Sequence, residues 1–164
     1  RVTKVLKHID MPTILFFLGI LMSVAALQSA GVLTDVANWL DKQVHEVFTI
    51  AGVIGVLSSV IDNVPLVAAC MGMYPVMDAA AVAASADPAY MQSFVQDGLF
   101  WHLLTYCAGV GGSLLIIGSA AGVVAMGLEK INFAWYFKKI TLLAFVGYLS
   151  GILVILLEHL LIGL

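Results

Sequence analysis

Asp62 is the one carboxylate in an otherwise apolar run from Val47 to Met77. A lone ionisable group inside such a run costs about 2.5–3.5 kcal/mol in lipid even on the lenient insertion scale, so by default it marks a functional site. Asn63 follows it, and Pro65 lacks the N–H that a continuous helix needs. Because Pro65 suits the first turn of a new helix capped by Asp62 or Asn63, the run is predicted to break here and to free backbone oxygens beside the acid.

A second long apolar run, Gly98–Leu128, contains two stretches rich in glycine and serine and no carboxylate. As continuous helix each of the two runs would reach about 46 Å, well past a hydrocarbon layer of about 30 Å, so each must tilt strongly or break. Irregular backbone at membrane depth is tolerated only where it is buried in protein or lines a wet cavity, so both breaks are expected to face something polar. The glycines predicted to set the backbone geometry of the second break are Gly109, Gly111, Gly112, Gly118 and Gly122.

The two breaks together offer the oxygen atoms that a hard monovalent cation prefers. Na⁺ needs clustered neutral and anionic oxygens, and Asp62 is the only anion that either break can supply. A site with one carboxylate can hold either Na⁺ or H⁺, and that competition is the chemistry of an antiporter. The other oxygens that the two breaks offer are backbone carbonyls and the hydroxyls of Ser58, Ser59, Ser113 and Ser119.

Each of these residues also has a purely structural interpretation. Asp62 and Asn63 could serve only as helix caps. The serines could bond back to their own helices or pack against a neighbour, and the glycines could serve close packing alone. His102, in the first half of the second run, could relay protons or simply bond to a neighbouring helix.

The composition predicts the elements that must hold these groups. Hydrophobic residues make up 62% of the sequence and charged residues 10%, and the mean hydropathy is +1.08. An ordinary soluble domain carries roughly 25% charged residues, so the chain is interpreted as an all-α integral membrane protein. The elements predicted for this single transmembrane repeat unit, residues 1–164, are a span at 10–33, a re-entrant helical hairpin at 46–77, a discontinuous transmembrane helix at 98–128, an interfacial segment at 130–139 and a last span at 140–163.

Positive charge favours a hairpin over a second crossing. If 46–77 enters and leaves on one side while 98–128 crosses, every Lys and Arg except Lys42 lies on the same side of the membrane. The positive-inside rule then makes Arg1 cytoplasmic. The chain starts with Arg1, and no cleavable signal pattern precedes the first span, so we expect a piece of a larger polypeptide.

The stretches Ser58–Ala69, Met71–Tyr74 and Gly109–Gly122 closely resemble the carboxy-terminal half of NhaD-type sodium/proton antiporters. Their ion transporter superfamily has two inverted repeats, each with one re-entrant hairpin and one discontinuous helix. The resemblance implies that this chain is the second of those inverted repeats, that an amino-terminal repeat completes the site, and that the protein forms a homodimer. The Ser-Asn-Thr tip of the dicarboxylate branch is absent, which argues against that substrate class. The functional positions that the resemblance implies are Ser58, Asp62, Asn63, Ser113 and Ser119. We therefore predict that Na⁺ binds at Asp62, Asn63 and Ser58, with Ser59, Ser113 and Ser119 as further ion-binding positions.

We therefore predict one half of a secondary transporter that exchanges Na⁺ or Li⁺ for H⁺ across the cell (inner) membrane of a bacterium or across an organellar membrane. It is predicted not to be an enzyme and to need no cofactor. Its expected partners are the lipid bilayer, the amino-terminal repeat and a second copy, with no role for nucleic acid.

Three alternatives stay open at this point. An anion or arsenite permease of the same superfamily would use half-helix N-termini to hold its substrate, although Asp62 would then repel that substrate unless it is protonated or paired. A structural membrane subunit without transport is the second alternative. The third is an intramembrane serine protease that pairs His102 with Ser113, but the Gly-x-Ser-x-Gly elbow is absent.

Overall fold

The computed structural model describes residues 11–162, and within them the regular secondary structure is helical apart from a single bridge between Met77 and Val95. The expected all-α class is confirmed. The helices are α2 (Met11–Ser29), α3 (Val32–Gln43), α4 (Val47–Leu57), α5 (Asn63–Met73), α6 (Ala79–Ala84), α7 (Pro88–Met91), the 3₁₀ turn η1 (Gln92–Phe94), α8 (Leu99–Gly111), α9 (Ala120–Leu128), α10 (Phe133–Lys139) and α11 (Thr141–Ile162).

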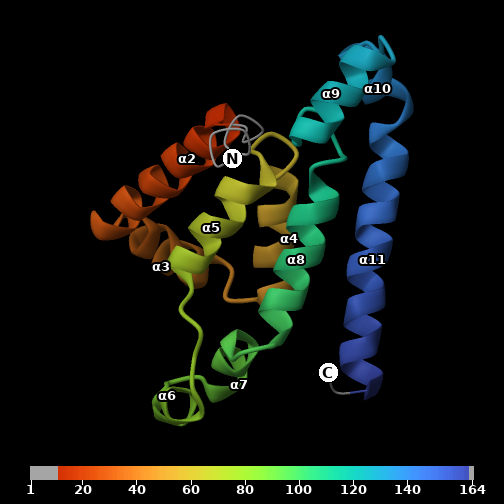
Figure 1. The fold of residues 1–164 in the computed structure, drawn as a ribbon. Helices are drawn as coiled ribbons and strands as arrows, with labels where there is room; N and C mark the ends of the chain where they lie inside the picture. Colours follow the sequence, from red (N-terminus) through yellow and green to blue (C-terminus); the bar gives the residue numbers. More distant parts are fainter. Residues whose placement is uncertain (1–10, 163–164) are drawn as a thin grey trace, which may run out of the picture.

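Helices α4 and α8 form the centre of the molecule, with α2, α3 and α5 on one side and α11 on the other (Figure 1). The two central helices approach closely because glycine faces backbone. A Cβ added to Gly111 would overlap the carbonyl oxygen of Gly55, and one added to Gly55 would lie 2.7 Å from Cys107 Cβ. Small residues at such a crossing let two helix backbones pack without intervening side chains.

The first helix ends earlier than the predicted span of 10–33. Helix α2 stops at Ser29, and Gly31 adopts a left-handed φ of 78° that a residue with a Cβ rarely takes. The chain then turns into α3, which the sequence analysis did not anticipate. Helix α3 buries Leu33 and Ala37 and exposes Asp35, so its amphipathic pattern is that of a helix packed on one face only.

The first long apolar run is two half-helices. Helix α4 begins after Glu46, whose carboxylate accepts hydrogen bonds from the backbone N–H groups of Phe48 (2.9 Å) and Thr49 (2.6 Å). The chain rises through α4, turns, and descends through α5 (Figure 1). We call the turn between them, Ser58–Asp62, the tip. Whether this pair enters and leaves a membrane on one side stays a prediction.

The second long run is also interrupted, as its glycines predicted. Helix α8 ends at Gly111 and α9 begins at Ala120, and we call the intervening segment Gly112–Ser119 the break. Short helices α6, α7 and η1 fill the segment from 78 to 98, for which the sequence analysis predicted no element. Their aromatic side chains pack into the core, where Phe94 lies 5.0 Å from Tyr74 and 4.8 Å from Phe100 between ring centroids.

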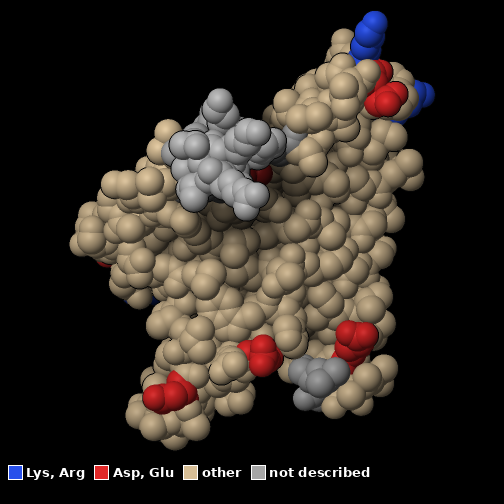
Figure 2. Space-filling model, in the orientation of Figure 1, with Lys and Arg blue, Asp and Glu red and all other residues tan. Residues whose placement is uncertain are grey.

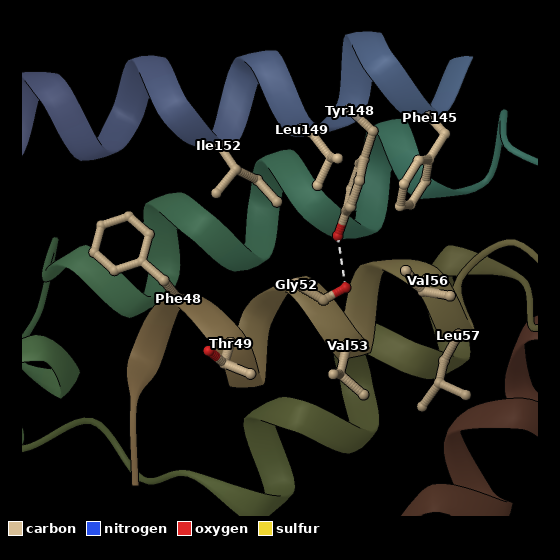
Figure 3. A pocket seen from close by; sticks show the side chains of 10 residues that line it. All are labelled: Phe48, Thr49, Gly52, Val53, Val56, Leu57, Phe145, Tyr148, Leu149 and Ile152. Carbon is tan, nitrogen blue, oxygen red and sulfur yellow. Dashed lines mark hydrogen bonds between the residues drawn. The ribbon is translucent and has the colours of Figure 1, made fainter. Parts of the chain in front are cut away.

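Helix α11 is the one helix among residues 11–162 that is long and apolar enough to cross a membrane, and almost all of it faces outward. It is attached to α4 by Tyr148, whose hydroxyl donates a 2.7 Å hydrogen bond to the Gly52 carbonyl across an apolar groove of about 460 Å³ (Figure 3). On the face shown in Figure 2, the charged side chains gather mainly at the upper and lower ends. That distribution suits a molecule whose middle contacts lipid.

Candidate functional site

The tip is attached to α8 by a buried serine. Ser58 is fully buried, and its hydroxyl donates a 2.7 Å hydrogen bond to the carbonyl oxygen of Ala108, fifty positions along the chain. Ser59 is also buried, at 4% exposure. The predicted ligand Ser58 therefore already uses its proton in holding the hairpin, while its oxygen lone pairs remain able to accept.

The break lies directly against the tip. A Cβ on Gly118 would overlap the carbonyl oxygen of Ser58 and would lie 2.7 Å from the carbonyl oxygen of Ser59. No side chain fits between the two backbones, so only glycine allows this contact. The structure thus brings the tip and the break together. The sequence did not predict which residues of the two segments would meet.

Asp62 occupies the N-cap position of α5 without using its side chain as a cap. The residue is half-buried, and its backbone oxygen accepts from the N–H of Leu66 at 3.3 Å. Asn63 is the first residue of α5 and is also half-buried, and Pro65 lies in the first turn as its missing N–H predicted. The carboxylate of Asp62 is consequently left available beside a helix N-terminus.

The serines of the break have local partners. The Ser113 hydroxyl donates to the Val110 carbonyl in the last turn of α8 at 2.7 Å. Ser119 is the N-cap of α9, and its hydroxyl accepts from the N–H of Gly122 at 3.0 Å. Both serines therefore fit the structural interpretation, and a role at an ion would use the lone pairs that these bonds leave.

The glycines in the break and in the helix turns beside it divide into two groups, crowded and open. A Cβ on Gly122 would overlap the Ile116 carbonyl oxygen, and one on Gly112 would lie 3.2 Å from the Gly118 carbonyl oxygen. Gly109 differs, because a Cβ there would meet nothing within 4 Å. Ile116 adopts a left-handed φ of 58°, a strained conformation for a β-branched residue, and is buried at 7% exposure.

Two side chains outside the predicted site satisfy carbonyls of the break. Tyr136 on α10 donates its hydroxyl to the Ser113 carbonyl at 2.7 Å, and Thr141 at the start of α11 donates to the Leu114 carbonyl at 2.7 Å. Sequence reasoning missed both residues, because neither lies near the glycine-serine stretches and no spacing links them. Their bonds hold the unwound backbone in one shape and occupy two carbonyls that could otherwise face an ion.

Four helix ends flank the tip and the break, and together they favour a bound ion. The N-termini of α5 and α9 carry the positive ends of helix dipoles, whereas the C-termini of α4 and α8 present carbonyl oxygens. A single carboxylate among such neutral oxygens can bind either a small cation or a proton. The proteolytic pair considered above is not formed, because His102 lies about 13 Å along α8 from its last residue, Gly111, and Ser113 lies beyond that end.

Comparison with known proteins places the chain in a family. The family described as citrate transporter, CitMHS, matches residues 1–95. This chain belongs to the citrate transporter family. Its relatives include sodium/proton antiporter 1 of Arabidopsis thaliana, which is 50% identical over 97% of this chain and 25% of the relative. Sodium/proton antiporter 2 of the same plant is 47% identical over 97% of this chain and 34% of that protein.

A bacterial relative is the Na⁺/H⁺ antiporter NhaD of Vibrio cholerae, 35% identical over 96% of this chain and 29% of the relative. The resemblance to NhaD-type antiporters is confirmed. The chain spans about a quarter to a third of the length of these curated relatives. No solved structure matches the chain. The family match and the relatives named antiporters support a membrane protein, in line with the apolar composition of the chain.

Proposed function

We propose that this chain is the carboxy-terminal repeat of a secondary transporter that exchanges Na⁺ or Li⁺ for H⁺, with Asp62 as the carboxylate at which the two ions compete. The observation that supports it is the contact between tip and break, where Gly118 lies against the Ser58 and Ser59 carbonyls within a few residues of Asp62. Relatives named sodium/proton antiporters support the same assignment. The complete site would need the amino-terminal repeat, and the intact transporter would work as a homodimer in an energised inner or organellar membrane.

In this proposal Asn63 and Ser58 complete the cation shell with carbonyls of the tip, and Ser59, Ser113 and Ser119 contribute further oxygens. Binding of Na⁺ would expel the proton from Asp62, because one carboxylate cannot hold both. An anion permease would need Asp62 to be neutral or paired, and among residues 11–162 no cationic side chain lies in ion-pair contact with it.

The experiment uses the complete parent protein in vesicles with a pH-sensitive dye. Asp62→Asn should abolish Na⁺-dependent proton movement, because the amide keeps the shape of the side chain but can neither release a proton nor neutralise the ion. Asp62→Glu should keep partial activity with a shifted pH profile, since the charge survives on a longer stem. Asp97→Asn is the matched control, because Asp97 is exposed and asparagine accepts its left-handed φ of 58°. Robust exchange by correctly inserted Asp62→Asn protein would refute the assignment.

A further inference from the structure

A cavity with several polar side chains in its lining lies at the other end of α5 from Asp62. It encloses about 260 Å³ between α3, the end of α5, α7 and η1. Helix α5 runs from Asn63 to Met73, so the cavity is about 16 Å along the helix from the tip. Apolar side chains form much of its wall, and its polar lining consists of Thr34, Asn38, Asp41, Tyr74 and Tyr90.

Asp41 is the centre of this polar lining. The Tyr90 hydroxyl donates to Asp41 Oδ1 at 2.7 Å, and the Tyr74 hydroxyl donates to the same oxygen at 3.3 Å. Both phenols are buried, at 8% and 5% exposure. In the part of the chain that the structure describes, no hydrogen bond reaches Asp41 Oδ2. One carboxylate oxygen is therefore held in place while the other is left for a ligand.

The charge of Asp41 is not compensated within residues 11–162. The one ion pair found there joins His45 to Asp87 at 3.2 Å, and no Lys or Arg pairs with Asp41. A half-buried carboxylate with no cationic partner has an electrostatic cost that a bound cation would offset.

The C-terminal ends of two helices near the cavity also favour a bound cation. Asp41 lies in the last turn of α3, which ends at Gln43, and Tyr74 is the C-cap of α5. Both helices therefore direct their negative C-terminal ends toward the region of Asp41. Unpaired carbonyls at two helix ends and one carboxylate produce a negative potential, and the ligand that such a potential attracts is a cation.

Tyr90, which lines the cavity, is also held in place by His45 and Asp87. The His45 ring stacks on the Tyr90 ring with 4.2 Å between centroids and bonds to Asp87, whose carboxylate accepts from the Tyr90 backbone N–H at 3.0 Å. Burial and the hydrogen bond to Asp41 raise the pKa of Tyr90, so this phenol stays protonated at neutral pH. The hydroxyl thus keeps donating to the carboxylate and presents a lone pair to the cavity.

We propose that this cavity is a second cation site, distinct from the one at Asp62, that takes Na⁺ or another hard monovalent cation on Asp41 and the surrounding hydroxyl and amide oxygens. One carboxylate with neutral oxygens suits a monovalent ion better than Ca²⁺, which prefers several carboxylates. A transition metal is the wrong occupant, because the described residues contain no group of three or more His, Cys, Asp or Glu side chains arranged to hold one.

The test measures thermal unfolding of the complete parent protein in NaCl and in choline chloride at equal ionic strength. The Asp62→Asn background removes the first site, so that any remaining Na⁺-dependent rise in the unfolding temperature comes from elsewhere. We expect Asp62→Asn protein to keep such a rise and Asp62→Asn/Asp41→Asn protein to lose it wholly or in large part. Asp62→Asn/Asp35→Asn is the matched control, since Asp35 is exposed on the same helix, and it should keep the full rise.

A merely structural role for Asp41 would lower the unfolding temperature equally in both salts, and that result would overturn the proposal. The proposal would also be overturned if Asp62→Asn protein showed no Na⁺-dependent rise in the unfolding temperature. Tyr90→Phe in the same background should raise the Na⁺ concentration needed for half of the rise several-fold, because it removes one oxygen without removing the charge. An unchanged half-saturating concentration would exclude the phenol as a ligand and contradict the site as described. These measurements do not depend on proton exchange. The second cation site can therefore be confirmed or excluded whether or not the proposed antiport is correct.

Discussion

Gly118 of the break lies against the carbonyl oxygen of Ser58 at the tip, so closely that a Cβ at position 118 would overlap that oxygen. The two residues belong to separate interrupted helices, and the Ser58 hydroxyl fixes their relative position through its bond to Ala108. Because backbone meets backbone, a shift of either element moves the other. The oxygens around Asp62 are therefore set by a contact that depends on one missing side chain.

Gly118→Ala should separate the tip from the break. The added methyl group cannot be relieved by rotating a flexible neighbour, because the atoms that it meets are backbone. We expect Na⁺-dependent exchange by the complete protein to fall at least tenfold. Gly109→Ala provides the control, since a Cβ there meets nothing within 4 Å. Equal activity of the two variants in vesicles would show that the close contact is not needed.

Ser113→Ala and Ser119→Ala should raise the apparent Michaelis constant for Na⁺ and leave a residual maximal rate. A neutral hydroxyl adds an oxygen ligand but carries no proton that exchanges near neutral pH. Ser119→Ala should also cost about 1 kcal/mol of stability, because Ser119 caps α9, whereas Ser119→Asn keeps a capping group. Flux measurements over a range of Na⁺ concentrations separate the two parameters. Wild-type Na⁺ affinity in both alanine variants would favour the purely structural interpretation.

The threading of α4 and α5 can be tested with single cysteines. In a background without Cys70 and Cys107, which are buried free thiols, cysteines at the exposed positions Thr34 and Ala86 should both react with an impermeant thiol reagent from outside. A cysteine at Asn132 should react only from the cytoplasmic side. Labelling of positions 34 and 86 from opposite faces would exclude a re-entrant hairpin.

Asp87 should give the stability of the α7 region a dependence on acidic pH. Its hydrogen bond from the Tyr90 backbone N–H, followed by the one from His45, lowers its pKa below the ordinary value. A lowered folded-state pKa stabilises the fold above the ordinary pKa, about 3.9, and this contribution is lost as pH falls through the folded value. Asp87→Asn should lower the unfolding temperature near neutral pH and converge with wild type in acid, whereas exposed Asp97→Asn should follow wild type throughout. A constant offset for Asp87→Asn would contradict this origin.

The sequence alone was enough to predict the all-α class and the places where two long apolar runs are interrupted. Those interruptions depend on local chemistry: Pro65 lacks an amide hydrogen, and the glycines of Gly109–Gly122 weaken a helix wherever the chain places them. The exceptional position of Asp62 was equally visible, because a lone carboxylate in an apolar run is conspicuous without any knowledge of its neighbours.

The tertiary structure decided which interruption meets which and what else lies nearby. The Ser58–Ala108 and Tyr136–Ser113 bonds, and the phenols around Asp41, join residues far apart in the chain, and no periodicity within one segment encodes such a pairing. Helix α3 and the short helices α6 and α7 were not predicted, although Gly31 and the aspartate caps Asp78 and Asp87 at their starts are local signals that the sequence contains. Local rules act over a turn of helix, whereas the site is made by backbones packed together across the core.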